Sequence, residues 1–130
     1  MTREDYDRYV AAFNARDYDS VFDFYIENPD MAFFGVEIRS REDLKAFYGF
    51  LHSFVKETVT VERFASSDNL AAVEAIVRIE AFEDLTRETL DAKGYQIFPI
   101  AKGEVQEMLQ LIHYHLRDGK IEQVRCALAG

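Results

Sequence analysis

Residues 70–82 read LAAVEAIVRIEAF, and their alternation decides the fold class. Every second position from Ala71 to Ala81 is apolar, whereas the positions between them include Glu74, Arg78 and Glu80. Successive side chains of a strand point to opposite faces of a sheet, so this period of two predicts a long strand with one buried face. We expect helices to cover the apolar face and the charged face to lie on the outside.

Strand patterns continue on both sides of this segment. The spacing predicts three further strands, over residues 58–64, 103–116 and 121–128. The apolar segment 31–38 contains Gly35 and is typical of a short strand or a bent extended segment. Residues 83–102 are too long for an ordinary hairpin connection, and either a flap or a short helix would suit them.

The first part of the chain has helical spacing instead. Thr2 is a suitable N-cap for a first helix, and Asp17 for a second, short helix that Pro29 would end. Ser40 begins a third helix, whose apolar stripe runs as far as Val55.

Helices followed by a run of strands indicate an α+β protein rather than repeated βαβ units. We expect a single domain over residues 1–130, because chains of this length rarely divide into two cores. The predicted form is a cone in which three N-terminal helices pack on a curved antiparallel sheet. Such a sheet leaves a cavity beneath the helices, and we expect any function to lie in that cavity.

Charge and composition exclude several classes of partner. Asp and Glu outnumber Lys and Arg by 24 to 15, which gives a net charge of −9. This argues against nucleic acid and against anionic membranes, since phosphates are bound by clustered basic side chains. The charged first residues and the lack of a long apolar stretch predict a cytoplasmic protein that does not cross a membrane.

A resemblance to a known family narrows the expectation. The stretch 8–19, RYVAAFNARDYD, closely resembles the first helix of bacterial ketosteroid isomerases, and residues 39–42 and 117–125 fit the same pattern. The chain is identified as a member of the nuclear-transport-factor-two-like superfamily, in the ketosteroid isomerase and SnoaL-like polyketide cyclase group. The resemblance covers almost the whole chain and implies a cystatin-like cone with a hydrophobic pocket. It says less about activity, because this fold carries enzymes and non-enzymes alike.

The isomerase machinery carries over only in part. Tyr9 falls where the isomerase has a Tyr that donates a hydrogen bond to the substrate oxyanion. Phe33 falls at the place of its Asp general base, with Asp30 three residues earlier, and Ile112 at the place of its protonated Asp. Two of the three chemical groups are therefore replaced by apolar residues that cannot exchange a proton.

Three residues remain candidates for catalysis, each with a structural alternative. Tyr9 is either an oxyanion donor or a partly buried helix aromatic. Asp30 is either a shifted general base at the pocket mouth or a turn residue after Pro29. His52 is either an acid–base group or a solvated residue, because it lies one position beyond the apolar stripe.

The remaining expectations concern the ligand. The predicted pocket walls are apolar with few polar anchors, which favours a hydrophobic small molecule; the wall residues are Phe33, Tyr48, Met108, Ile112, Tyr114, Val124 and Leu128. The function expected is isomerase, cyclase or dehydratase chemistry by proton transfer on a hydrophobic cyclic ketone. The alternative is a non-catalytic ligand-binding or dimerisation module that has lost its acid–base residues.

The sequence also bears on cofactors and assembly. We find no glycine-rich phosphate loop, and the pair His113 and His115 lacks a third metal ligand, so we expect no cofactor. Leucines, histidines and charges on the outer strand faces favour a homodimer that forms through the outer face of the sheet.

Overall fold

The computed structural model describes residues 1–129, whereas Gly130 lies outside the described part. Six strands form one sheet in the order β2-β1-β6-β5-β4-β3. The strands are β1 (Tyr25–Phe33), β2 (Val36–Ile38), β3 (Val55–Ser66), β4 (Leu70–Ala81), β5 (Val105–Arg117) and β6 (Lys120–Leu128). The helices are α1 (Arg3–Asn14), α2 (Tyr18–Phe22), α3 (Arg41–Leu51) and α4 (Arg87–Lys93).

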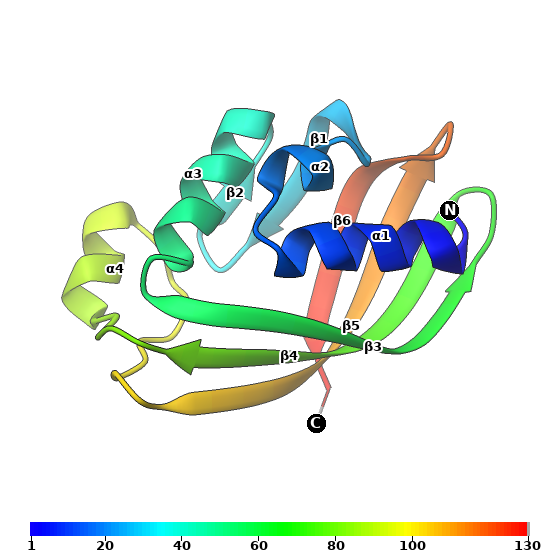
Figure 1. The fold of residues 1–130 in the computed structure, drawn as a ribbon. Coiled ribbons are helices and arrows are strands. Elements are labelled where there is room, and N and C mark those ends of the chain that lie inside the picture. The colour runs from blue at the N-terminus through cyan, green and yellow to red at the C-terminus, as the bar shows by residue number, and fades with distance from the viewer. Residues whose placement is uncertain (130) are drawn as a thin grey trace.

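The layers are those expected of an α+β cone. Figure 1 shows α1, α2 and α3 on one side of a strongly curved sheet, with the long strands β3, β4 and β5 bending beneath them. The short helix α4 lies at one end of the sheet. Either a flap or a short helix was expected within residues 83–102, and the structure contains a helix there. The predicted fold class is confirmed.

The two long N-terminal helices begin at the predicted caps. The Thr2 side chain accepts from the backbone of Asp5, whose carboxylate accepts in return from the Thr2 backbone. Ser40 caps α3 by accepting from the backbone of Asp43, whose carboxylate accepts from the backbone of Arg39. These caps satisfy backbone N–H groups in the first turns of α1 and α3.

The second helix is shorter than predicted. It ends at Phe22, and β1 begins at Tyr25, whereas helix was expected up to Pro29. Strand β1 pairs in parallel with β6, so one neighbour pair of the sheet is not antiparallel. Its register shifts between Tyr25 and Asp30. Pro29 has no backbone N–H to donate to a regular ladder, and it is tolerated at this position because the pairing is irregular there.

The third helix also stops early. It ends at Leu51 with His52 as its C-cap, and Val55 already belongs to β3. Residues 55–57 are therefore extended, although the helical stripe was expected to continue to Val55 and the strand to begin at 58. This boundary places one side chain, that of Glu57, on the inner face of the sheet.

The register of the long strands confirms which faces look inward. Ile112 lies opposite Val73 on β4 and opposite Cys126 on β6, on the face beneath the helices. On the outer face, Arg78 of β4 lies opposite Glu107 of β5. No helix within residues 1–129 is both long and apolar enough to cross a membrane.

Candidate functional site

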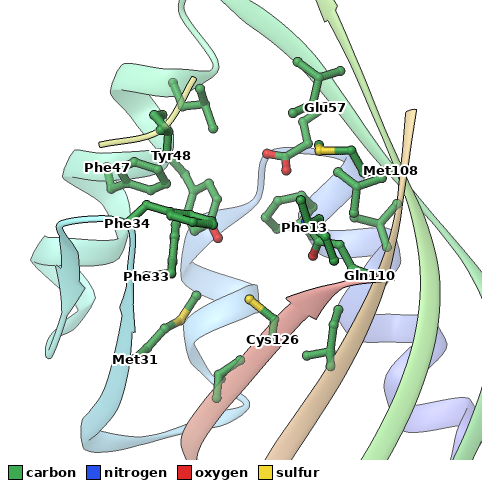
Figure 2. A pocket seen from close by; sticks show the side chains of 18 of the residues that line it. Phe13, Met31, Phe33, Phe34, Phe47, Tyr48, Glu57, Met108, Gln110 and Cys126 are labelled. Carbon is green, nitrogen blue, oxygen red and sulfur yellow. The ribbon is translucent and has the colours of Figure 1, made fainter. Parts of the chain in front are cut away.

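A cavity of about 210 Å³ lies between the helices and the curved sheet. Its walls come from α1, α3, the segment after α4 and the inner faces of β1 and of β3 to β6. Figure 2 shows side chains from these elements converging on one space. The lining is mostly aromatic and aliphatic, which suits an apolar ligand.

The mouth of the cavity is aromatic. Phe34 and Phe98 line it and are 53% and 68% exposed, with their ring centroids 6.4 Å apart. Phe34 lies in the tight turn between β1 and β2, where both Phe34 and Gly35 have positive φ. This turn packs on the end of α4, since the Gln96 amide donates to the Phe34 carbonyl at 2.7 Å.

Four buried tyrosines form the opposite end of the cavity. The hydroxyls of Tyr6 and Tyr114 lie 2.8 Å apart, and those of Tyr9 and Tyr25 lie 2.6 Å apart. The Tyr25 hydroxyl also donates to the sulfur of Met31 at 3.9 Å, which leaves the Tyr9 hydroxyl as the donor to Tyr25. Burial raises the pKa of Tyr9, so this phenol stays protonated, with its proton engaged by Tyr25.

Glu57 brings a carboxylate into this apolar space. Among the described residues that line the cavity it alone carries a formal charge. Its side chain is only 13% exposed, and its Oε1 lies 2.8 Å from Nε2 of His52. No hydrogen bond within the described chain involves Oε2, which leaves this oxygen free for a ligand.

His52 lies behind Glu57 and away from the cavity surface. It is 3% exposed, and the alternative of a solvated histidine is therefore wrong. Its Nδ1 lies 2.7 Å from the hydroxyl of Tyr18, a residue of α2. The imidazole is thus held on both sides, and its position fixes the direction of the Glu57 carboxylate.

Tyr48 reaches the cavity from α3. Figure 2 shows its hydroxyl and the Glu57 carboxylate approaching the cavity from different walls. Within residues 1–129 the Tyr48 hydroxyl makes no hydrogen bond, so it is free to donate to a ligand. Burial raises the pKa of Tyr48, and the nearby charge of Glu57 raises it further. The group is therefore a neutral donor that faces an anionic acceptor.

The structure places the predicted wall residues around this space. All seven of them line the cavity: Phe33, Tyr48, Met108, Ile112, Tyr114, Val124 and Leu128. Tyr9 lines it as well, as a residue that is 8% exposed. The two places where the resemblance led us to look for acids, Phe33 and Ile112, are apolar parts of the wall.

Asp30 lies elsewhere, and neither expectation for it holds. It belongs to β1, where Pro29 and Met31 are buried and Asp30 between them is exposed on the other face. It pairs there with Arg39 and accepts from Gln123 at 3.0 Å. The hydrogen bond from Arg39 lowers the pKa of Asp30. The residue is an exposed partner of an ion pair that does not reach the cavity.

Glu57 was missed because the strand was predicted to begin at residue 58, whereas it begins at Val55. From Val55 onward the alternate positions are Val55, Glu57, Val59 and Val61, an apolar face that one carboxylate interrupts. An acid on the inner face of a strand is a signal in its own right, since burial of an unpaired charge is unfavourable. The correct strand boundary would have revealed it.

Comparison with known proteins identifies the family. A profile of the SnoaL-like domain family matches residues 6–124. The chain belongs to the SnoaL-like domain family. No curated protein matches this SnoaL-like chain.

Solved structures share the SnoaL-like fold. One is provisionally assigned as a polyketide cyclase from Silicibacter sp.; it is 26% identical with a TM-score of 0.75, over 95% of this chain and 85% of that one. A second such protein, from Xanthomonas campestris, is 20% identical with a TM-score of 0.73, over 92% and 84% of the two chains. A hypothetical protein from Catenulispora acidiphila has a ketosteroid isomerase-like fold and was solved with trimethylamine. It is 10% identical with a TM-score of 0.72, over 98% and 86% of the chains.

The SnoaL-like chain brings few metal-binding side chains together. Within residues 1–129 no three His, Cys, Asp or Glu side chains are placed to hold a metal ion. His113 lies opposite Arg125 on the outer face of the sheet, and His115 opposite Gln123. The chemistry that the site itself offers is that of a carboxylate, a phenol and an imidazole in an apolar cavity.

Proposed function

We propose that the protein is an enzyme that moves a proton on a hydrophobic cyclic ketone and requires no cofactor. Its reaction would be of the isomerase, cyclase or dehydratase type. Glu57 is the general base, and Tyr48 donates a hydrogen bond to the ketone oxygen. The observation that carries the proposal is the Glu57 carboxylate, which lies in an apolar cavity with one oxygen held by His52 and the other free.

Glu57 has the properties that a base for a carbon acid needs. Few water molecules can solvate it, because it is 13% exposed and surrounded by Phe13, Met108 and other apolar side chains. The hydrogen bond from His52 fixes its direction, so Oε2 faces a bound ligand.

Tyr48 supplies the complementary electrophile. Removal of a proton next to a ketone moves negative charge onto the ketone oxygen, and a donor at this oxygen stabilises the charge. The Tyr48 hydroxyl has no partner within the described chain, whereas the Tyr9 hydroxyl donates to Tyr25. We therefore assign to Tyr48 the role that the family resemblance assigned to Tyr9.

The cavity also limits the substrate class. Its described lining contains one carboxylate and no Lys, Arg or His, so a ligand with a carboxylate or phosphate inside it would be repelled. A neutral ring compound with one carbonyl group satisfies both the apolar walls and the Tyr48 donor. The likeness to the Silicibacter protein, provisionally assigned as a polyketide cyclase, supports this class.

The experiment uses nitrobenzisoxazole as a small neutral probe. A base takes the ring C–H proton of this compound, the N–O bond breaks, and a coloured cyanophenolate forms. We expect Glu57→Gln to lower kcat/KM roughly 100-fold or more, the usual contribution of a general base. Glu62→Gln, an exposed position on the same strand, is the matched control and should act like the wild type. Equal rates in the wild type and Glu57→Gln would refute the assignment.

A second candidate function is ligand binding without catalysis. The observation in its favour is that Phe33 and Ile112, at the two places of the isomerase acids, are apolar wall residues. In that case Glu57 would be only a hydrogen-bond acceptor. The wild type would then bind a β,γ-unsaturated cyclic ketone, seen by calorimetry, without converting it to the conjugated isomer.

The proposal includes a homodimer formed through the outer face of the sheet. This face carries both signs of charge, with Arg78 opposite Glu107, and exposed Leu111 lies further along β5, opposite Glu74. Light scattering should give twice the chain mass for the wild type and a monomer for Leu111→Glu; a wild-type monomer would contradict the proposal.

A further inference from the structure

Phe34 occupies a backbone position that a phenylalanine rarely takes. It is the first of the two central residues in the turn that joins β1 to β2, and its φ of +45° is followed by a φ of +79° at Gly35. Positive φ at both central residues is typical of a type I′ hairpin turn, in which Asn-Gly and Asp-Gly are preferred. A bulky side chain is strained in this region, so Phe34 makes its own turn less stable.

The other two-residue hairpin of the sheet has the usual residues. Arg117 pairs with Lys120, so Asp118 and Gly119 form the turn between β5 and β6. Their φ values are +51° and +80°, close to those in the turn between β1 and β2. The chain therefore builds the same kind of turn once with Asp-Gly and once with Phe-Gly. Turn formation does not account for a phenylalanine at position 34.

Packing within the protein does not account for it either. The Phe34 side chain is 53% exposed, and its aromatic neighbour Phe98 is 68% exposed. Figure 2 shows Phe34 directed toward the cavity, and both rings belong to the cavity lining. An exposed aromatic ring and a strained backbone are two separate disadvantages at one residue. Strained residues of this kind are concentrated where a protein contacts a ligand.

The opposite side of the mouth is held in a fixed position. Arg87 of α4 donates to the backbone carbonyls of Tyr95 and Ile97 at 2.6 and 2.9 Å. These hydrogen bonds attach the segment that carries Phe98 to the helix. Phe34 and Phe98 are therefore already in place in the free protein, and a ligand would not have to order them on binding.

The size of the cavity indicates what reaches the two rings. Its volume is about 210 Å³, whereas a cavity of about 150 Å³ in another protein holds a single benzene molecule. One ring with a small substituent therefore fills most of the space. A ligand with a second ring extends through the mouth, where Phe34 and Phe98 lie.

We propose that Phe34 and Phe98 form an aromatic platform that binds the second ring of a two-ring ketone while the first ring lies in the cavity. The inference rests on the proposed function for its ligand class, a neutral ring compound with one carbonyl group. It adds that the ligand carries a second apolar ring on the side away from this carbonyl. Aromatic rings attract one another in offset or edge-on arrangements, and the platform leaves such surfaces open.

The first experiment compares cyclohexanone with 4-phenylcyclohexanone in NMR titrations of the ¹⁵N-labelled protein. The wild type should bind the phenyl compound roughly 10- to 100-fold more tightly, the usual effect of burying one aromatic ring. In Phe34→Asn and in Phe98→Ala this ratio should fall roughly three- to tenfold, while the Kd of cyclohexanone changes less than about twofold. Phe82→Ala is the matched control and should keep the wild-type ratio, because Phe82 is exposed and is not part of the described cavity lining.

The second experiment tests whether Phe34 is present for binding rather than for folding. Phe34→Asn places a preferred residue in the turn, so its Tm should rise by roughly 3–5 °C. Asp118→Phe makes the opposite change in the equivalent turn and should lower Tm by a similar amount. A Tm of Phe34→Asn below that of the wild type would show that Phe34 supports the fold and would overturn the proposal.

The readouts separate the platform from the role of Glu57. Equal ligand ratios in the wild type, Phe34→Asn and Phe98→Ala would overturn the platform and leave the base assignment intact. A normal ligand ratio together with turnover that Glu57→Gln leaves unchanged would support the platform and refute Glu57 as the base.

Two further outcomes would also overturn the platform. Binding of neither ketone by the wild type would refute the ligand class and the platform together. Unchanged ligand ratios with loss of dimer mass in Phe34→Asn, measured by light scattering, would show that the two rings contact a second copy of the chain instead of a ligand.

Discussion

The hydrogen bond between Tyr6 and Tyr114 joins the first helix to the sheet at the inner end of the cavity. Tyr6 belongs to α1 and Tyr114 to β5; they are 1% and 4% exposed, and their hydroxyls lie 2.8 Å apart. Tyr114→Phe removes one hydroxyl and keeps the ring that packs edge-on against Tyr6 at 5.4 Å. We expect this variant to fold and to be less stable.

The magnitude follows from the burial of both groups. A typical net hydrogen bond contributes about 1 kcal/mol, and a buried polar group left without a partner costs about 1–3 kcal/mol. The free energy of unfolding should therefore fall by about 1–3 kcal/mol. For a chain of 130 residues each kcal/mol corresponds to roughly 3–5 °C in Tm.

The assay is urea unfolding followed by circular dichroism, with a double-mutant cycle. Tyr6→Phe combined with Tyr114→Phe removes both hydroxyls, so no unpaired group remains, and the double variant should be more stable than the two single effects predict by about 1–2 kcal/mol. Tyr95→Phe is the control and should change stability by less than about 0.5 kcal/mol. Additive single effects, or a Tyr114→Phe variant as stable as the control, would refute the reasoning.

Three further predictions concern the donor, the cavity mouth and the alkaline range. Tyr48→Phe should lower kcat for nitrobenzisoxazole roughly tenfold or more. Tyr9→Phe should lower kcat less than Tyr48→Phe does, because the Tyr9 proton is already donated to Tyr25. Steady-state rates in the reverse order would contradict the assignment. Gly35→Ala should destabilise the protein by about 1–3 kcal/mol in urea unfolding, because its φ is +79° and the new Cβ would lie 2.8 Å from the Gly94 carbonyl oxygen. Gly119→Ala is the control: its φ is +80°, but no atom lies close to the new Cβ, so its loss of stability should be smaller. Burial raises the pKa of Tyr6 to about 12, above the value of about 10 in an unfolded chain. The contribution of the neutral Tyr6 to stability is therefore complete below about pH 10 and is lost as the pH rises toward 12. A urea midpoint that rises over this pH range would contradict the prediction.

Most of the fold could be predicted from the sequence because its signals are local. Thr2 and Ser40 cap their helices through bonds to residues three positions away, and the alternation of β4 reports its own two faces. The pairing of Tyr25 with Ile121, which turns the end of the predicted second helix into strand β1, is a contact between distant parts of the chain. No local pattern in residues 24–28 predicts this pairing.

The candidate site could be predicted in its walls but not in its chemistry. The wall residues follow from strand alternation, which is why Met108, Ile112 and Tyr114 were found together. We expected Asp30 at the mouth because it lies three residues before the position of the isomerase base. Distance along the sequence gives no information about which face of β1 the residue occupies. Glu57 was hidden by a helical stripe that continued past the true end of α3.

Residues 48–57 bring the donor, the imidazole and the carboxylate together by geometry that is local to the helix-to-strand junction. Tyr48 and His52 are four residues apart and share one face of α3 and its cap. The chain then turns into β3, and Glu57 on the inner face returns to Nε2 of His52. Only Tyr18, which holds Nδ1, comes from elsewhere in the sequence. A Tyr, a His four residues later and an acid five residues after that, across the end of a helix and the start of a strand, is therefore a pattern that would predict this arrangement in another chain of the same fold.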